Sequence, residues 1–536
     1  MAPLLALAGF MGCGKSSVGT LVAGHLGWDF IDLDEAFVAS EDSTIAEFFA
    51  RLGEAAFRER ECDVLEQVLA ARREDQGLVL ALGGGTLESA RARTRLKALG
   101  GVVYLEIDAE SAWQRARGSG RPLATDEEAF GALLARRRRI YEDCASVVWP
   151  VEGQDVESLS LGLSRLVAAA GGAWQTLWGR RLIATERTSL VVGGAGSLRI
   201  IGERARQVRE AGRRVYVISD RTVMAAWGER FLDLAGVPAE QALAIEPGEA
   251  SKSPAMLAEC WGWLADRGAR RDDVVVAFGG GVVGDLAGFT AATYQRGVEL
   301  WQVPTTLLAQ VDSSIGGKTA IDLTAGKNLV GAFYQPDLVV ADPVTLTTLR
   351  DEDFKGGLGE VVKHVLLISS EALDRLENAV PGLLRRDLAT SAAIVKESVD
   401  FKARVVQQDE REGGVRAILN LGHTVGHALE VTEGYGQMSH GVAVALGLQV
   451  ALAVSEEVLG LDRSVRERVR RVCEALGLPT SWPIESAEAV IGATGRDKKV
   501  RAGSSGFVGL RAPGDPVWGI DVSPQLLVRC MEAIRQ

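Results

Sequence analysis

The stretch LLALAGFMGCGKS, residues 4–16, decides the fold of the front of this chain. Its short apolar run opens into GxxxxGKS, the pattern of a phosphate-binding loop between a buried strand and a helix. The glycines tolerate unusual dihedral angles, so backbone N–H groups can converge on phosphate oxygens. Lys15 would neutralise charge on the transferred phosphate, and the Ser16 hydroxyl would bind Mg²⁺. The expected phosphate- and nucleotide-binding residues are Gly12, Gly14, Lys15, Ser16 and Ser17.

Length and composition limit the class of protein. At 536 residues the chain is too long for one hydrophobic core. A net charge of -12 argues against a nucleic-acid or anionic-membrane partner. Six cysteines without a CxxC pair predict a reducing, cytoplasmic location. The longest apolar stretch, Val442–Val454, contains Gly447 and Gln449 and is too short to span a bilayer, so we expect a buried helix.

The rhythm of apolar segments predicts the fold class, which is α/β. Strands and amphipathic helices alternate in the front region, a pattern typical of a parallel sheet. Strands are expected at 4–8, 78–82 and 102–107, and helices at 17–26, 55–71 and 127–144. We expect a P-loop domain with a parallel sheet, a Rossmann-like α/β dinucleotide-binding domain and a mostly α-helical metal-binding domain. The predicted bounds are 1–170, a linker at 171–180, 181–345 and 346–536.

Carboxylates, arginines and a glycine run downstream of the phosphate loop indicate the acceptor. Asp32 and Asp34 are expected at the end of a second strand. Asp32 could reach the metal through water, and Asp34 could take a proton from an acceptor hydroxyl. Glycines 83–85 allow the acceptor to approach closely. Three arginines complete the set: Arg58 on a helix, Arg121 in a lid and Arg137 in a second clamp for a substrate carboxylate.

The motifs GKS, DxD, GExxFR, GGG and RPL follow in an order that makes residues 1–170 resemble shikimate kinase. The resemblance implies a kinase that uses Mg²⁺ and ATP to phosphorylate the 3-hydroxyl of shikimate. It assigns Asp34, Arg58, Gly84, Arg121 and Arg137 to shikimate or to the lid. A gluconate-type kinase shares the loop but would not need this pair of arginines for a carboxylate.

Histidines are concentrated in the C-terminal part of the chain. The chain has five, and four of them are His364, His423, His427 and His440. His423 and His427 are spaced i, i+4 and would share one helix face. Glu360 lies in the nearby string GEVVKH. One carboxylate and two imidazoles leave a coordination position open for substrate, as a catalytic Zn²⁺ site requires.

A glycine turn and a group of cations also mark the rear. The string GGGVVGD at 279–285 follows an apolar strand and contains GxGxxG, which alone is a weak dinucleotide signal. Asp220, at the end of an earlier strand, is better placed to hold a ribose than Glu299. Cations that gather in an acidic protein suggest a substrate carrying both phosphate and carboxylate. They are Arg296, Lys318, Lys327, Lys363, Lys402 and Arg416.

Residues 180–536 resemble 3-dehydroquinate synthase, through strings that include PGEASKS, GGGVVGDLAGF, GKNLVGAFYQP, GEVVKH and LNLGHTVGHALE. The resemblance implies bound NAD⁺ and Zn²⁺ (or Co²⁺), the metal held by Glu360, His423 and His440, and it makes His427 catalytic. Around the substrate it implies Arg296, Lys318, Asn328, Lys363, Lys402, Arg416 and Asn420. For NAD⁺ it implies Asp220, Glu249, Lys252, Gly280, Gly281, Val282, Asp285, Thr305, Thr306, Asp312, Lys327 and Thr348. Lys498 or Lys499 would close the site.

Two departures from the family pattern concern these sites. Thr222 stands where Asn often follows the ribose acid, which affects one cofactor hydrogen bond. Val442 stands where Glu commonly follows the glycine after His440, which affects the groups expected to orient the metal ligands.

The residues and the two resemblances together predict a bifunctional enzyme of the shikimate pathway. It would phosphorylate shikimate and convert 3-deoxy-D-arabino-heptulosonate 7-phosphate to 3-dehydroquinate and phosphate. Its partners would be these small molecules, with a homodimer through the C-terminal module implied by resemblance. One alternative is a cyclase for a sugar phosphate without a carboxylate, against which Arg416 and Asn420 argue. Another is a chain in which one half is a catalytically inactive binding or oligomerisation module.

Overall fold

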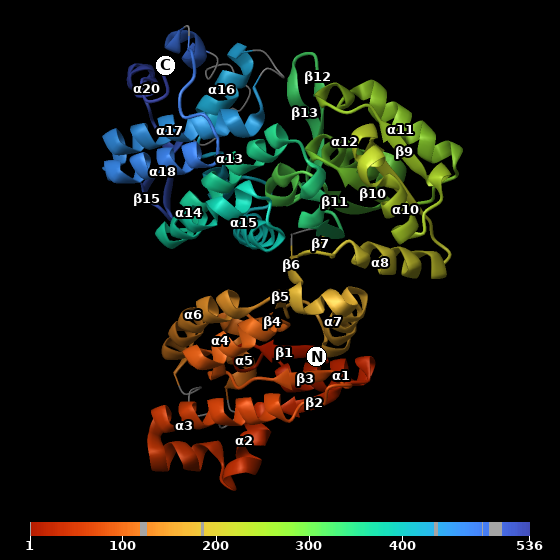
Figure 1. Ribbon diagram of the computed structural model, residues 1–536, viewed down its shortest axis with the longest axis vertical. Coiled ribbons are helices and arrows are strands. Elements are labelled where there is room, and N and C mark those ends of the chain that lie inside the picture. Colours follow the sequence, from red (N-terminus) through yellow and green to blue (C-terminus); the bar gives the residue numbers. More distant parts are fainter. Residues whose placement is uncertain are drawn as a thin grey trace. The chain divides into compact units, whose positions relative to one another are not determined.

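A computed structural model of the chain describes residues 2–117, 126–183, 187–433, 438–484, 486–492 and 506–535. The chain divides into two compact units, Met1–Arg181 and Leu182–Gln536 (Figure 1). Arg121, Lys498 and Lys499 lie outside the described residues, so their expected roles stay predictions.

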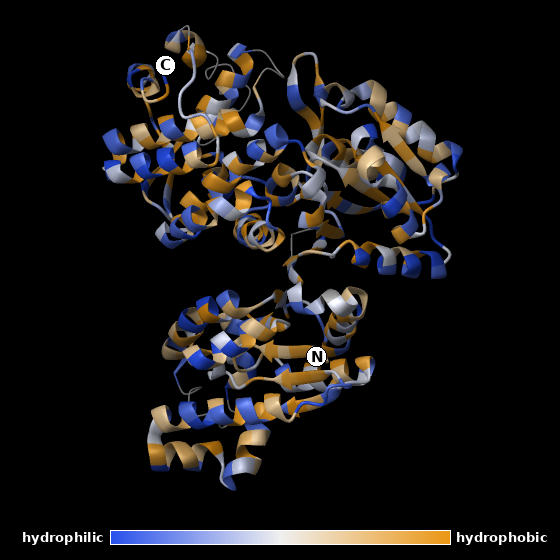
Figure 2. Cartoon of the chain, viewed as in Figure 1, coloured by the Kyte–Doolittle hydropathy of each residue, from blue (hydrophilic) through white to orange (hydrophobic). Residues whose placement is uncertain are grey.

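The first unit is a parallel sheet with helices packed against it. Its strands lie in the order β2-β3-β1-β4-β5-β6, and neighbours run parallel. The strands are β1 (Leu4–Ala8), β2 (Asp29–Asp32), β3 (Leu78–Ala81), β4 (Val102–Glu106), β5 (Val147–Pro150) and β6 (Trp178–Ile183). The helices are α1 (Lys15–Leu26), α2 (Leu33–Glu41), α3 (Ile45–Ala70), α4 (Ala90–Leu99), α5 (Ala109–Ala116), α6 (Glu127–Cys144) and α7 (Val156–Ala170). Strands β1 and β3 are wholly apolar (Figure 2) and buried, because helices cover a parallel sheet.

Two elements of the first unit differ from the sequence prediction. Helix α3 begins at Ile45, not at residue 55, because Thr44 and Glu47 form a capping box and the chain continues helical after a turn at Gly53 (φ 79°). Asp34 lies in α2 and not at a strand end. Asp32 ends β2, and its carboxylate accepts the backbone N–H of Asp34 at 2.9 Å, which starts the helix there.

The segment expected as a linker, 171–180, is folded against the first unit. Gly171–Thr176 form the 3₁₀ turn η2, and β6 pairs in parallel with β5. Trp174 is 1% exposed, and its indole N–H donates to the backbone oxygen of Leu4 at 2.8 Å. The burial of this large side chain makes the segment part of the core, and the chain passes to the second unit after Arg181.

The second unit begins with another parallel sheet, of order β7-β14-β11-β10-β8-β9. Its strands are β7 (Thr188–Gly193), β8 (Val215–Asp220), β9 (Ala242–Ile245), β10 (Val274–Gly279), β11 (Glu299–Pro304) and β14 (Leu338–Ala341). The longer helices are α8 (Arg199–Glu210), α10 (Glu229–Ala235), α11 (Pro254–Asp266) and α12 (Gly281–Thr293). An antiparallel hairpin, β12 (Lys318–Leu323) and β13 (Gly326–Phe333), projects beside α12 (Figure 1). Strand β10 leads into α12 through the GxGxxG turn, as predicted.

Beyond β14 the chain is mostly helical, as expected. The helices are α13 (Asp351–Ile368), α14 (Ser370–Leu384), α15 (Leu388–Gln408), α16 (His423–Glu433), α17 (His440–Leu459), α18 (Arg463–Ala475) and α20 (Pro524–Met531). A short hairpin, β15 (Phe507–Ala512) and β16 (Asp515–Ile520), packs on α17. Among the described helices only α17 is long and apolar enough to cross a membrane, and 72% of its apolar window is buried inside the protein. This burial makes α17 the core helix that the sequence predicted.

Candidate active sites

The phosphate-binding loop connects β1 to α1. Gly12 and Gly14 have φ values of 87° and 89°, which side chains rarely tolerate. The Lys15 ammonium donates to the backbone oxygen of Gly9 at 2.9 Å. The Ser16 hydroxyl donates to Oδ2 of Asp32 at 2.6 Å. The hydroxyl and the carboxylate expected to hold Mg²⁺ are therefore adjacent.

The glycine run at 83–85 brings the proposed acceptor residues together. A Cβ atom added to Gly83 would lie 2.7 Å from a carboxylate oxygen of Asp34, and one on Gly85 would lie 2.1 Å from Nη2 of Arg58. A Cβ atom on Gly84 would lie 4.0 Å from Nη1 of Arg137. Three side chains from α2, α3 and α6 thus approach one short backbone segment. A residue larger than glycine at position 83 or 85 would displace Asp34 or Arg58.

Arg58 and Arg137 each have a side-chain N–H group that no described residue accepts. Arg58 donates through Nη1 to Glu61 at 2.8 Å, and Glu61 is buried and accepts the Thr86 hydroxyl at 2.6 Å. The sequence reasoning missed Glu61, although it lies three residues after Arg58 on the same helix face. Burial lowers the pKa of Arg58, but Glu61 and Glu88 outweigh this effect and raise it. Within the described part of the chain, the buried Nε atoms of Arg58 and Arg137 have no hydrogen-bond partner. An anion could accept from both.

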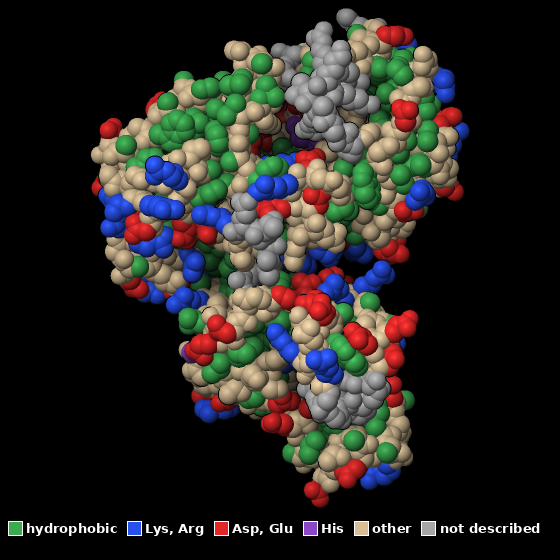
Figure 3. Space-filling view, turned by 180° about the vertical axis from the view of Figure 1, so that it is seen from behind, with side chains coloured by type: hydrophobic (Ala, Val, Ile, Leu, Met, Phe, Trp, Pro, Cys, Tyr) green, Lys and Arg blue, Asp and Glu red, His purple; other side chains and the backbone are tan. Residues whose placement is uncertain are grey.

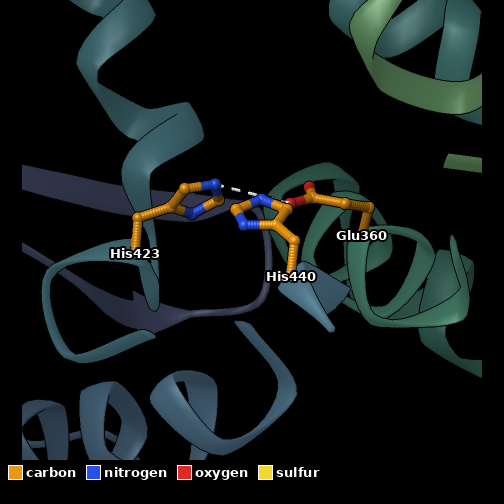
Figure 4. Close-up of side chains that lie close together, drawn as sticks. All are labelled: Glu360, His423 and His440. Carbon is orange, nitrogen blue, oxygen red and sulfur yellow. Dashed lines mark ion pairs between the residues drawn. The ribbon is translucent and has the colours of Figure 1, made fainter. Parts of the chain in front are cut away.

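In the second unit, Glu360 of α13 lies between two imidazoles. Its Oε1 is 3.4 Å from Nε2 of His423 and 3.4 Å from Nε2 of His440 (Figure 4). Glu360 is fully buried and His423 is largely buried. Ligands about 2.1 Å from a tetrahedral Zn²⁺ lie about 3.4 Å apart, so this donor set fits the ion. The sequence prediction of a Glu/His/His centre therefore has matching geometry.

The outer ring nitrogens of both histidines also have partners. Nδ1 of His440 lies 3.1 Å from Oε2 of Glu430, and Nδ1 of His423 lies 3.3 Å from the backbone oxygen of Leu421. Such partners orient metal-bound imidazoles. Glu430 is the last residue of the string LNLGHTVGHALE, which predicted no role for it, and its carboxylate contacts the His440 ring although position 442 is Val. Burial lowers the pKa of His440, but Glu360 and Glu430 outweigh it and raise that pKa to about 10, whereas burial and the Lys363 charge lower the pKa of His423 to about 4.

The remaining histidines occupy different environments. The His427 ring lies 5.3 Å from that of His423 and 5.8 Å from that of His440, beside the cluster. His364 is fully buried, with Nε2 3.6 Å from Oδ1 of Asp312, so its nearest carboxylate is Asp312 and not Glu360. Figure 3 shows histidine at the bottom of a hollow in the second unit, with acidic and basic side chains around it.

Expected substrate residues surround the same region. Lys363 forms an ion pair with Glu360, and Lys402 donates to Oδ1 of Asp312 at 2.7 Å. Asp312, expected at NAD⁺, lies within 4.8 Å of Glu360, one of the expected metal ligands.

Arg416 is buried, and it donates to the backbone oxygen of Gly316 at 3.1 Å. Glu412 accepts from Lys318 at 2.5 Å and from Asn420 at 2.8 Å. No motif includes Glu412, because its contact with Lys318 joins residues far apart in the chain.

Five of the expected NAD⁺ residues, Asp220, Gly280, Gly281, Thr305 and Thr306, lie at the ends of β8, β10 and β11. Gly280 and Gly281 begin α12, and a Cβ atom on Gly280 would lie 3.0 Å from Cγ2 of Thr306. The Thr305 hydroxyl is buried without a hydrogen-bond partner in the described structure. Asp220 caps a helical turn, accepting from Val223 at 2.9 Å.

Lys252 connects the cofactor and substrate sets. Its ammonium donates to Asp285 at 2.8 Å and to the side chain of Asn328 at 2.6 Å, and it lies 3.3 Å from Glu249.

The other expected NAD⁺ residues have the following positions. Lys327 lies 3.8 Å from Glu430. The Thr348 hydroxyl accepts from the indole of Trp227 at 2.7 Å. Val282 is in the first turn of α12.

Arg296 is the exception among the expected substrate residues. It is exposed, and no contact within the described residues joins it to the others. Its backbone has a φ of 63°, in the left-handed region.

The fold and these sites define a P-loop phosphotransferase joined to a metal-dependent enzyme with a dinucleotide-binding sheet. Three family models match: "Shikimate kinase" over residues 11–165, "3-dehydroquinate synthase N-terminal" over 242–356 and "3-dehydroquinate synthase C-terminal" over 357–500. The 3-dehydroquinate synthase of Synechococcus sp. (strain CC9605) is 42% identical over 365 residues, which are 66% of this chain and 97% of that protein. The chain belongs to the 3-dehydroquinate synthase family and carries a shikimate kinase domain in front of it.

Two solved structures are similar to parts of the chain. One is ValA (2-epi-5-epi-valiolone synthase) from Streptomyces hygroscopicus subsp. jinggangensis 5008 with NAD⁺ and Zn²⁺ bound, with a TM-score of 0.58 and 24% identity over 65% of this chain and 97% of that chain. This likeness shows the fold of the second unit. The other is shikimate kinase from Acinetobacter baumannii in complex with shikimate, with a TM-score of 0.30 and 32% identity over 32% of this chain and 96% of that chain.

Proposed function

We propose that the first unit transfers the terminal phosphate of ATP to the 3-hydroxyl of shikimate. The gathering of Asp34, Arg58 and Arg137 around the glycine run carries this proposal. Asp34 takes the hydroxyl proton, while Arg58, Arg137 and the backbone at Gly84 bind the acid. In the phosphate loop, Gly12, Gly14, Lys15 and Ser17 bind ATP, and Ser16 and Asp32 hold Mg²⁺. Arg121 is the proposed lid cation.

We further propose that the second unit converts 3-deoxy-D-arabino-heptulosonate 7-phosphate to 3-dehydroquinate and phosphate. The position of Glu360 between two imidazoles carries this proposal. Glu360, His423 and His440 would hold Zn²⁺ or Co²⁺. When bound, the metal polarises a substrate hydroxyl and NAD⁺ accepts and returns a hydride.

Side chains of the protein bind and orient the substrate and transfer a proton. Lys318, Lys402 and Arg416 balance the phosphate and the carboxylate, and His427 moves a proton beside the metal ligands. Asn328, Lys363 and Asn420 orient the substrate, with Arg296 and Lys498 or Lys499 as further proposed contacts. The residues proposed for NAD⁺ are Asp220, Glu249, Lys252, Gly280, Gly281, Val282, Asp285, Thr305, Thr306, Asp312, Lys327 and Thr348.

The setting proposed for both reactions is a reducing cytoplasm, with a homodimer formed through the second unit. The six cysteines are buried and unpaired, which supports the first part. The partners are the small substrates and cofactors, with no nucleic acid and no membrane.

Paired substitutions test both assignments in one chain. Lys15→Ala should abolish ATP-dependent phosphorylation of shikimate and leave phosphate release from the heptulosonate phosphate intact, because the sites are separate. His423→Ala should do the reverse and lower the zinc content. Phosphorylation that survived Lys15→Ala would remove the kinase assignment. Phosphate release unaffected by chelation, or turnover only of a sugar phosphate without a carboxylate, would remove the synthase assignment.

A further inference from the structure

A glutamate that none of the motifs includes lies against the arginines of the first unit. Glu88 ends the 3₁₀ turn η1 (Thr86–Glu88), which directly follows the glycine run. Its Oε2 accepts from Nη2 of Arg137 at 2.5 Å and lies 3.7 Å from Nη2 of Arg58. Its Oε1 accepts from Nη2 of Arg136 at 2.7 Å. One carboxylate therefore contacts the guanidinium groups of all three arginines.

The environment keeps Glu88 charged. Burial raises its pKa, but hydrogen bonds from Arg137 and Arg136 outweigh burial and lower it. The side chain of Glu88 is 21% exposed, and that of Arg137 only 3%. Water therefore screens this pair weakly compared with a surface pair. An anion that approached Arg58 and Arg137 would meet a negative charge already bound to both.

Other contacts hold the two arginines in place without Glu88. Arg58 is also bound by the buried Glu61 and lies 5.1 Å from the ring centre of Phe57. Arg137 is buried and lies 5.9 Å from the ring centre of Phe10. Loss of the Glu88 charge should therefore leave both guanidinium groups positioned, with more of their positive potential available to a ligand.

We propose that Glu88 is an internal competitor for the carboxylate-binding arginines, and so determines the affinity and specificity of this site for carboxylate substrates. The inference rests on the proposed shikimate kinase function, since Arg58 and Arg137 are the proposed clamp. A substrate carboxylate must draw these arginines away from Glu88, whereas a neutral substrate gains nothing from doing so. The affinity for the acid is thereby lower than the two arginines alone would give.

The test is Glu88→Gln in the full chain, which removes the charge and keeps the shape. We expect the KM for shikimate to fall about fivefold, with kcat and the KM for ATP within twofold of the parent. The Kd for shikimate, measured by titration without ATP, should fall equally. With the methyl ester of shikimate, which has no negative charge, the KM should be the same in variant and parent.

Glu54→Gln is the matched control. Glu54 also pairs with Arg58, at 3.5 Å, but its side chain is 63% exposed, so its charge is screened and the KM should not change. Glu88→Ala provides a second variant with the same expected direction. An unchanged or higher KM for shikimate in both Glu88 variants would overturn the proposal, as would an equal fall for the ester. Failure of the parent to phosphorylate shikimate would instead refute the kinase assignment.

Discussion

Lys402 illustrates how burial sets the chemistry of single residues in this protein. Its side chain is 8% exposed, and its ammonium donates to both the backbone oxygen and Oδ1 of Asp312. Burial lowers the pKa of Lys402 to about 8, against the opposing effect of Asp312. The positive charge of Lys402, proposed to bind an anionic substrate, is therefore lost in a pH range in which kinetics can be measured.

We expect kcat/KM of the synthase reaction to fall above pH 8, by up to about tenfold per unit, as Lys402 loses its proton. Protein stability should not fall with it. The folded-state pKa lies below the ordinary lysine value of 10.5, so the unfolded chain binds more protons between these values and Lys402 contributes stability as pH rises through that window. A pH profile of kcat/KM, together with thermal unfolding over the same pH range, checks both expectations. Lys402→Arg should move the fall to higher pH, and a wild-type profile flat to pH 9 would contradict the assignment.

At the scale of elements, close approach of helices positions the proposed metal ligands. A Cβ atom on Gly441 would lie 1.5 Å from the backbone oxygen of Gly356, and one on Gly359 would lie 2.1 Å from the backbone oxygen of Gly441. Gly441 follows His440 at the start of α17, and Gly359 precedes Glu360 on α13. Glycine contacts between α13 and α17 thus bring these two ligands together.

Gly441→Ala should therefore separate α13 from α17. We expect the free energy of unfolding to fall by about 1–3 kcal/mol, as for other overpacked sites. The zinc content should also fall, because His440 moves away from Glu360. Gly262→Ala in α11 is the matched control: nothing lies within 4 Å of its added Cβ atom, so its stability should be equal or slightly higher. Full zinc loading of Gly441→Ala would contradict this account.

At the scale of the whole molecule, each unit has its own sheet and its own proposed site, so each should fold alone. A fragment ending at Arg181 retains Trp174 and the part of β6 up to Arg181, whereas one ending at Ala170 loses both. We expect fragment 1–181 to phosphorylate shikimate and to exceed fragment 1–170 in unfolding free energy by about 3–5 kcal/mol, the usual effect of deleting a buried Trp. Chemical denaturation measures the difference. Equal stability would mean that residues 171–181 are a linker after all.

Periodicity and glycine turns were enough to predict the two parallel sheets and the helical end of the chain. Strand β1 and helix α6 have the predicted bounds, because their apolar residues follow the spacing of a buried strand and of a helix face. Local capping decided what periodicity missed: Thr44 starts α3 early, and Asp32 starts α2. The motif GHTVGH likewise placed His423 and His427 on one helix, since i, i+4 spacing is a local property.

The sequence by itself determined which functional groups are present, because the phosphate loop, the arginine pair and the Glu/His/His donors can all be identified from it. Only the tertiary structure decided which acids accompany them. Glu88 and Glu412 meet their partners through contacts across the fold that no motif records. A lone glutamate in a sequence usually predicts a solvated surface, because its burial beside a cation depends on where the rest of the chain folds.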